Sequence, residues 1–119
     1  MGTHATIGYW DPEKGHVVEA YLHYDGASAG ATLREHYNSL ELAKYLVSGG
    51  DMSTLGASCS APEGHSFSTP VDGYTVYYRR DRGESGCGPR STHMLALRLR
   101  TDIIYLFKDD EWQVFSGSL

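Results

Sequence analysis

The spacing of hydrophobic residues changes along this chain, and the change limits the folds that the chain can form. Ala5, Ile7 and Tyr9 alternate with polar or small residues, and a similar alternation runs through residues 16–24. A period of two is typical of a β-strand. Pro and Gly between these stretches, in residues 11–15, favour a turn. The N-terminal part of the chain therefore predicts a β-hairpin.

Residues 28–48 change to helical spacing, with apolar residues three or four positions apart. Ser28 and Ser39 belong to the residue types that cap helix N-termini. Because Asn38 interrupts the pattern, the segment predicts two short helices, or one helix that is kinked near Asn38. Gly49–Gly50 favours a stop, since glycine readily adopts the left-handed conformation that ends a helix.

The rest of the chain contains a long irregular segment and further strand patterns. Residues 51–72 have little periodic apolar content. Residues 74–79 are rich in Tyr and Val and predict a strand. Residues 91–100 fit either a short helix or a strand. Residues 103–107 and 112–115 are apolar arms around an acidic turn and predict a second hairpin.

Together these patterns predict an α+β fold. We expect an antiparallel sheet of about five strands with two or three short helices on one face. The 119 residues, 40% hydrophobic and 21% charged, are enough for a hydrophobic core. They fit one domain, residues 1–119, because no linker or repeat divides the chain.

The net charge of -5 excludes some classes of partner. An acidic surface disfavours direct binding to nucleic acid or to an anionic membrane, but it suits a basic protein partner. No apolar run reaches the roughly 20 residues that span a bilayer. No export signal is visible at the N-terminus, so we expect a cytoplasmic protein. The sequence leaves the oligomeric state open, a homodimer included.

Several motifs, in order and along most of the chain, resemble those of a known family. They are Met1-Gly2-Thr3 followed by Ala5 and Ile7, Tyr21 to Gly26, Glu35 to Asn38, Gly50 to Gly56, Arg80 to Glu84 and Tyr105 to Asp109. The chain resembles a largely uncharacterised family of small proteins encoded by bacteriophages, prophages and mobile elements. The resemblance implies a phage accessory role in a host cell and no particular reaction. Residues 24–28 depart from the Trp-Asp-Gly-Tyr-Pro that is common in the family.

The acidic turn of the second predicted hairpin is one candidate binding surface. Asp109, Asp110 and Glu111, with Asp102, would give a negative edge beside Trp112. Such an edge can dock on a basic groove or mimic nucleic acid. The alternative is a charged turn that only keeps a sheet edge soluble.

A local basic cluster is the candidate for a small ligand. It comprises Tyr77, Tyr78, Arg79, Arg80, Arg82 and Gly83. Arginine suits phosphate, and tyrosine can stack on a base, so the cluster could bind or sequester a nucleotide. The alternative is that Asp81 and Glu84 neutralise the arginines in a structural ion-pair network.

His23, Asp25, Glu35 and His36 include the residue types of a metal or acid–base site, which would suit a small metal-dependent hydrolase. Against this, neighbouring residues on a helix diverge by about 100°, so Glu35 and His36 do not easily face one ion. A structural His36 is the alternative.

Cys59 and His65 repeat the spacing of Cys87 and His93, which resembles a loose Cys2His2 zinc site. Structural zinc sites usually begin with two closely spaced cysteines. The alternative is a pair of unlinked thiols with two exposed loop histidines.

The leading hypothesis is a non-enzymatic protein that binds and inhibits a host or anti-phage defence protein, such as a CRISPR effector or a restriction enzyme. That partner could itself bind nucleic acid. No catalytic motif is recognisable, and we expect no cofactor. The surface residues that we expect to contribute are Tyr21, Tyr24, Asp25, Tyr77, Tyr78 and the acidic turn.

Overall fold

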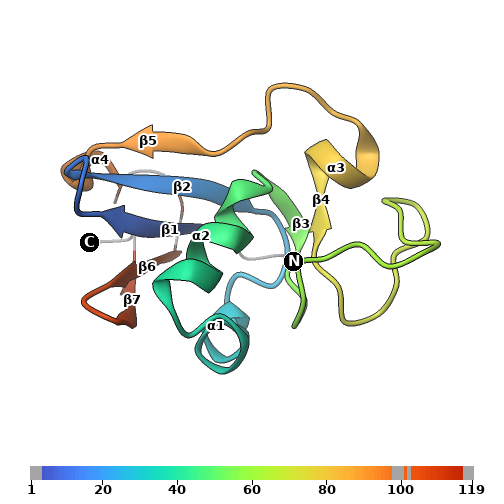
Figure 1. Cartoon of the computed structure of the whole chain (residues 1–119), viewed down its shortest axis with the longest axis horizontal. Coiled ribbons are helices and arrows are strands. Elements are labelled where there is room, and N and C mark those ends of the chain that lie inside the picture. Colours follow the sequence, from blue (N-terminus) through green and yellow to red (C-terminus); the bar gives the residue numbers. More distant parts are fainter. Residues whose placement is uncertain (1–3, 98–100, 102, 117–119) are drawn as a thin grey trace.

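A computed structural model describes residues 4–97, 101 and 103–116, and these residues form an α+β fold (Figure 1). Along the chain the elements are β1 (Ala5–Asp11), β2 (His16–Leu22), α1 (Ala29–His36), α2 (Leu40–Ser48), β3 (Met52–Thr54), β4 (Val76–Tyr77), α3 (Tyr78–Arg82), β5 (Arg90–Thr92), α4 (Met94–Leu97), β6 (Ile103–Lys108) and β7 (Glu111–Ser116). Across the described residues, every helix is too short or too polar to traverse a bilayer.

The strands form one mixed sheet in the order β4-β3-β2-β1-β6-β7, with β5 paired to β2. Both predicted hairpins, β1–β2 and β6–β7, are present and antiparallel. The expectation of a wholly antiparallel sheet of about five strands is wrong in detail, because β1 pairs with β6 and β2 pairs with β3 in parallel. Parallel neighbours need a long crossover connection, and α1 and α2 provide it between β2 and β3.

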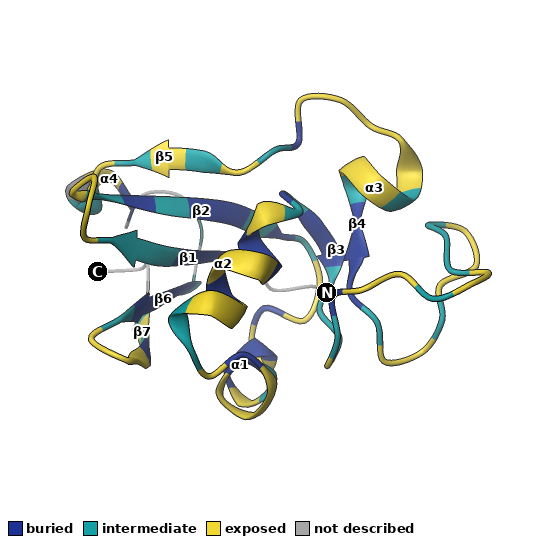
Figure 2. Cartoon of the chain, in the orientation of Figure 1, coloured by how far each residue is buried: buried dark blue, intermediate teal, exposed yellow. Residues whose placement is uncertain are grey.

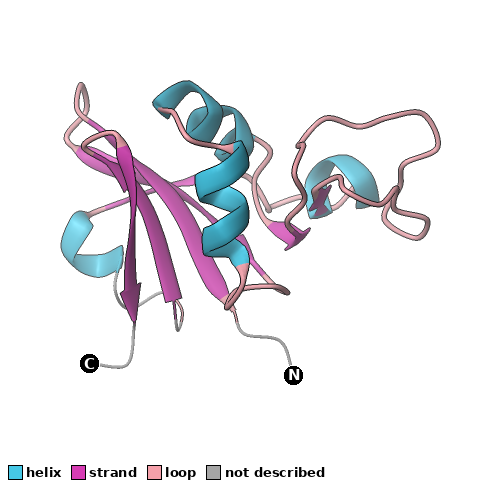
Figure 3. Ribbon diagram, turned by 90° about the horizontal axis from the view of Figure 1, so that it is seen from below, coloured by secondary structure: helices cyan, strands magenta, loops and turns pink. Residues whose placement is uncertain are grey.

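The main hydrophobic core lies between the sheet and the first two helices (Figures 2 and 3). Helices α1 and α2 cover one face, as the sequence predicts. A smaller cluster, formed by Val17, Leu97, Ile104 and Leu106, lies on the other face beneath α4. The helices therefore do not all lie on one face of the sheet, because the apolar side of α4 covers the second cluster.

The break between the predicted helices falls where the sequence places it. Ser39 caps α2, since its hydroxyl accepts the Leu42 N–H at 3.1 Å. Ser28 precedes α1 without a side-chain cap, and its hydroxyl donates instead to the carbonyl of Asp25. Gly50 follows α2 with a φ of 87°, and a Cβ there would overlap the carbonyl oxygen of Cys87. This position requires glycine for both reasons.

The strand predicted over residues 74–79 is shorter than expected. β4 holds only Val76 and Tyr77, and the chain then turns into α3. The Asp81 carboxylate accepts the Tyr77 N–H at 2.8 Å and so stabilises the start of the helical turn. Gly83 ends the turn in the left-handed conformation, with its N–H donated to the Arg79 carbonyl. Local hydrogen bonds thus override the β-propensity of the tyrosines.

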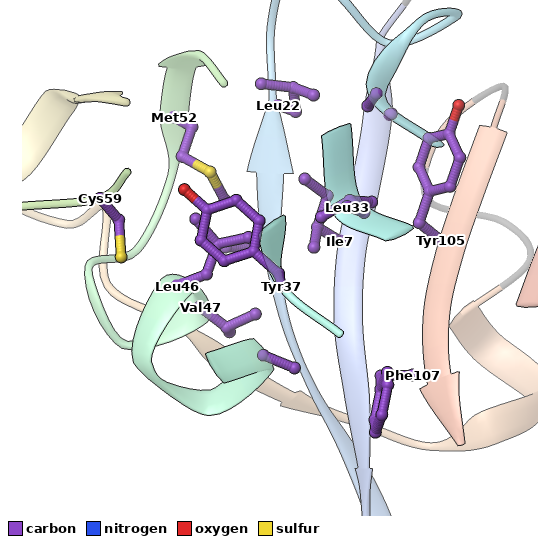
Figure 4. Packing of buried hydrophobic residues seen from close by; sticks show 14 of the residues in the cluster. Ile7, Leu22, Leu33, Tyr37, Leu46, Val47, Met52, Cys59, Tyr105 and Phe107 are labelled. Atoms are coloured by element: carbon purple, nitrogen blue, oxygen red, sulfur yellow. The ribbon is translucent and has the colours of Figure 1, made fainter. Parts of the chain in front are cut away.

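Three of the nine tyrosines are buried in the core, and Figure 4 shows two of them, Tyr37 and Tyr105. The hydroxyl of Tyr37 donates to the Gly56 carbonyl at 2.7 Å, and the hydroxyl of Tyr77 donates to the Leu46 carbonyl at 2.6 Å. Tyr105 makes the same kind of bond to a loop carbonyl. Each ring fills the core while its polar tip satisfies a backbone group that would otherwise be buried without a partner.

We expect Tyr37→Phe to lower the free energy of unfolding by about 1 kcal/mol. The Gly56 carbonyl would lose its shorter donor and keep only the Thr75 hydroxyl, at 3.3 Å. Urea denaturation measures this change. Tyr45→Phe is the matched control, because the Tyr45 side chain is exposed and its loss should leave stability unchanged.

We also expect Tyr37 to make the folded protein less stable at alkaline pH. Burial raises the pKa of Tyr37 to about 12, whereas the unfolded chain releases this proton near the ordinary value of about 10. Its contribution is therefore complete below about pH 10 and falls as the pH rises towards about 12. Tyr37→Phe should lose less stability than the wild type over this interval. An equal loss in both proteins would contradict the assignment.

Candidate functional site

The acidic turn connects β6 to β7 at the end of the sheet that lies away from α3 (Figures 1 and 3). Asp109 and Asp110 form this two-residue connection, Glu111 opens β7, and all three side chains are exposed. Asp109 and Asp110 both have left-handed backbones, with φ values of 56° and 62°. The tight turn thus places the carboxylates at the tip of the β6–β7 hairpin. Asp102 lies outside the described residues.

The residue types at this turn are unusual for its geometry. Two-residue hairpins with left-handed backbones strongly favour Asn-Gly or Asp-Gly, because glycine adopts this conformation without strain. A side chain in the left-handed region costs about 1 kcal/mol, and Asp110 occupies the position where glycine is usual. The second carboxylate is therefore present at a small conformational cost, which aspartate bears more readily than most other side chains.

A surface hollow of about 260 Å³ lies beside the turn, and Asp109 and Asp110 form part of its wall. Apart from the turn, its lining residues are Trp10, Pro12, Leu40, Phe107 and Lys108. They come from β1, the β1–β2 connection, the start of α2, and β6. The hollow therefore combines an apolar lining with an acidic rim, which suits a side chain with an aliphatic stem and a cationic head.

One cation already lies at this hollow. The Lys108 ammonium is 3.3 Å from the Asp109 carboxylate and 6.0 Å from the centre of the Trp10 ring. Among the described residues, no cation is within ion-pair distance of Asp110 or Glu111. Two carboxylates of the turn therefore take part in no ion pair with the described residues.

The arginines of the basic cluster are occupied by contacts within the protein. Arg80 donates to the carbonyls of Cys59, at 2.6 Å, and Thr75, at 3.1 Å, and pairs with Asp81 at 2.8 Å. Arg79 donates to the Ser48 carbonyl at 3.0 Å. These bonds attach α3 to the long segment between β3 and β4 and to the end of α2.

The other members of the cluster also contact the fold. Arg82 lies 3.5 Å from Glu84 and 4.8 Å from the centre of the Phe67 ring. Tyr78 is half-buried with its ring beside Phe67, and Tyr77 is 2% exposed in the core. Arg80 and Arg82 thus form the ion pairs that the structural alternative predicts, whereas Arg79 bonds a backbone carbonyl.

Asp81 is the centre of this network. Its side chain is 3% exposed and lies 3.3 Å from Nε2 of the buried His65 ring. Burial alone would raise the pKa of Asp81, but hydrogen bonds from Arg80 and from the Tyr77 N–H outweigh it and hold this pKa below its ordinary value. Asp81 is therefore a buried anion whose charge is balanced by the fold.

A second ionic network on the other face of the sheet carries no obvious signal in the sequence. The Glu19 side chain is 1% exposed and accepts the Thr92 hydroxyl at 2.7 Å. Arg90 lies 3.7 Å from Glu19 and donates to Asp51 at 2.7 Å. These contacts attach β5 to β2 and to the start of β3.

The residues of the hydrolase hypothesis lie apart. His36 pairs with Glu35 at 3.7 Å on an exposed part of α1. Asp25 is exposed beside a different cavity, of about 430 Å³, whose wall includes Asp72. His23 contacts Tyr24, which is 48% exposed. Within residues 4–97, 101 and 103–116, no three His, Cys, Asp or Glu side chains are grouped to hold a metal ion.

The cysteines and histidines of the loose zinc pattern have other neighbours. Cys59 is buried beside Tyr37 (Figure 4), and burial raises the pKa of its thiol. The Cys87 thiol donates to the Glu84 carboxylate at 3.3 Å. Both cysteines are free, as the alternative predicts, but the His65 ring is buried against Asp81 and is not an exposed loop histidine.

The sequence analysis did not identify two features of the structure. The hollow beside the acidic turn joins elements that are far apart in the chain, such as Trp10 and Phe107, and no local pattern indicates it. His4 and His23 form a stacked pair, with ring centres 4.7 Å apart. The second feature follows from the first hairpin, because extending the register from Ala5 opposite Leu22 places His4 opposite His23.

Comparison with known proteins identifies no relative: no family model, no curated protein and no solved structure matches the chain. The surface chemistry of the described residues is therefore the basis for assigning a role.

We expect Arg80→Ala to lower the free energy of unfolding by about 2–3 kcal/mol, because it leaves the buried Asp81 without its cation. Arg82→Ala is the matched control and should change stability by less than about 1 kcal/mol, since its ion pair is exposed. Urea denaturation of both variants tests this assignment. Equal, small effects would show that Arg80 is not a structural residue.

Proposed function

We propose that this protein is a small binding protein that docks its acidic β6–β7 turn on a basic surface of a host or anti-phage defence protein and inhibits that protein. The observation that carries the proposal is the pair of adjacent left-handed aspartates, Asp109 and Asp110, on the rim of an apolar hollow. Opposite charge across an interface speeds association and selects the partner.

The chemistry of the hollow indicates what the partner presents. A lysine or arginine side chain could lay its stem against Trp10 and Phe107 and direct its cation to Asp110. Tryptophan faces also attract cations, as the position of Lys108 illustrates. We therefore expect a partner with an exposed Lys or Arg within a basic patch, such as a protein surface that binds nucleic acid.

The phage setting comes from the resemblance of the sequence motifs and stays a prediction. It supplies the class of target, a host or defence protein, and the acidic turn supplies the mode of binding. Tyr24, Asp25 and Tyr78 lie outside the hollow, and we assign them no role in this contact.

The variant Asp109→Asn/Asp110→Gly separates binding from stability. Asn-Gly is the residue pair that favours this type of turn, so the variant should keep the turn. Its free energy of unfolding should rise by about 1 kcal/mol. Binding should fall at least tenfold, because two carboxylates are lost from the centre of the contact. Glu63→Gln/Asp72→Asn removes the same net charge from exposed loops and is the matched control.

The partner is first captured from host lysate with the wild type and with both variants. We expect the partner to be captured by the wild type and by the control variant, but not by the turn variant. The purified partner is then tested for direct binding at low and high salt and for loss of its own activity. A captured protein that binds the turn variant equally, or that keeps full activity in the complex, would rule out the proposal.

A further inference from the structure

β7 is the strand at one end of the sheet, and it differs from the other marginal strands in length. It pairs with β6 through six consecutive residue pairs, whereas β4 holds two residues and β5 holds three. Natural edge strands are usually very short, or they carry Lys, Pro or a bulge, which prevents pairing with another chain. Residues 111–116 contain no Lys or Pro, and their register is unbroken. The outer edge of β7 is therefore suited to accept a further strand.

The register shows which backbone groups lie at this outer edge. In a two-residue hairpin the two residues that flank the turn exchange backbone hydrogen bonds, and bonded and non-bonded pairs then alternate along the strands. Lys108 lies opposite Glu111, so the backbone groups of residues 111, 113 and 115 face β6. The N–H and C=O groups of Trp112 and Val114 consequently point outwards, as a row of donors and acceptors for an added strand.

Both faces of the sheet offer apolar surface beside this edge. The Val114 side chain is 45% exposed. Phe115 points to the opposite face, where it lines a hollow of about 410 Å³ together with apolar side chains of α4 and β6. Because side chains alternate between the two faces of a strand, two successive residues of an added strand would lie beside Val114 and Phe115. Apolar residues suit both positions.

The charge at the start of β7 favours a basic segment over a second copy of this chain. The carboxylates of Asp110 and Glu111 take part in no ion pair with the described residues, and β7 begins directly after the turn. A residue of an added strand opposite Glu111 would lie next to both carboxylates. Residues 111–119 contain no Lys or Arg, so a second copy paired through its own β7 would bring no cation to this position.

We propose that β7 binds an extended segment of the basic partner as an additional strand of the sheet. Two successive apolar residues of that segment lie opposite Val114 and Phe115, and a Lys or Arg lies opposite Glu111. Backbone hydrogen bonds to Trp112 and Val114 supply affinity, and the cation selects the segment. This inference rests on the proposed function, because it names the part of the partner that the acidic turn receives.

Two synthetic peptides test the edge in the full chain. Thr-Val-Val-Thr-Thr-Lys-Thr fits an antiparallel added strand, and the reversed sequence fits a parallel one. With an excess of one of them, amide hydrogen exchange measured by NMR should slow at least fivefold at Trp112 and Val114. The Gln113 amide already faces β6 and should not change. The same peptide with Glu in place of Lys should bind at least fivefold more weakly.

Val114→Pro removes one outward N–H without removing a bond to β6, and proline is tolerated at such positions of edge strands. It should weaken binding of the peptide, and of the captured partner, at least tenfold. Val114→Thr keeps the N–H and is the matched control, which should bind nearly as the wild type does. Circular dichroism shows whether each variant is folded. If Val114→Pro does not fold, the exchange measurement on the wild type decides.

Unchanged exchange at Trp112 and Val114 with both peptides would overturn the inference, and so would equal binding by Val114→Pro and Val114→Thr. A wild-type dimer in which these two amides are protected before peptide is added would assign the edge to a second copy, and would also overturn it. The proposed function fails separately, if the captured partner binds the turn variant as tightly as the wild type.

Discussion

Hydrogen bonds from side chains to backbone carbonyls hold together a fold in which one connection, between β3 and β4, is long and largely polar. The Tyr37 hydroxyl donates to the Gly56 carbonyl, and the Tyr77 hydroxyl donates to a carbonyl near the end of α2. The Arg80 guanidinium donates to the carbonyls of Cys59 and Thr75. The segment between β3 and β4 has little apolar content of its own, and Cys59 and Leu55 are its side chains that join the main core. Its backbone is ordered because the core supplies donors at defined positions.

These polar contacts also determine which charges are compensated within the fold. The arginines near α3 are the most conspicuous charged group in the sequence, yet Arg80 and Asp81 neutralise each other inside the fold. The carboxylates of Asp110 and Glu111 have no such cation among the described residues. Two carboxylates that have no ion pair among the described residues therefore lie at the opposite end of the sheet from the basic cluster.

Local periodicity was sufficient to predict both hairpins, the break before α2 and the Ser39 cap, because neighbours in sequence determine these features. The α+β class followed from them. The parallel pairing of β1 with β6 could not be predicted, since it joins residues about a hundred positions apart and depends on how the helices pack. The acidic turn was predicted from its composition, whereas the hollow beside it requires the tertiary arrangement of Trp10, Leu40 and Phe107.

The pairing of β1 with β6 also bears on how the protein is made. β1 is a central strand, and it lacks its neighbour on one side until Ile103–Phe107 has been synthesised. During translation the nascent chain can form the first hairpin and the two helices, but one edge of β1 stays open while ribosomes complete most of the sequence. Exposed strand edges of this kind invite association between chains. Rapid expression should therefore favour aggregation of nascent chains, and slower synthesis or a chaperone that covers β1 should raise the yield of folded protein.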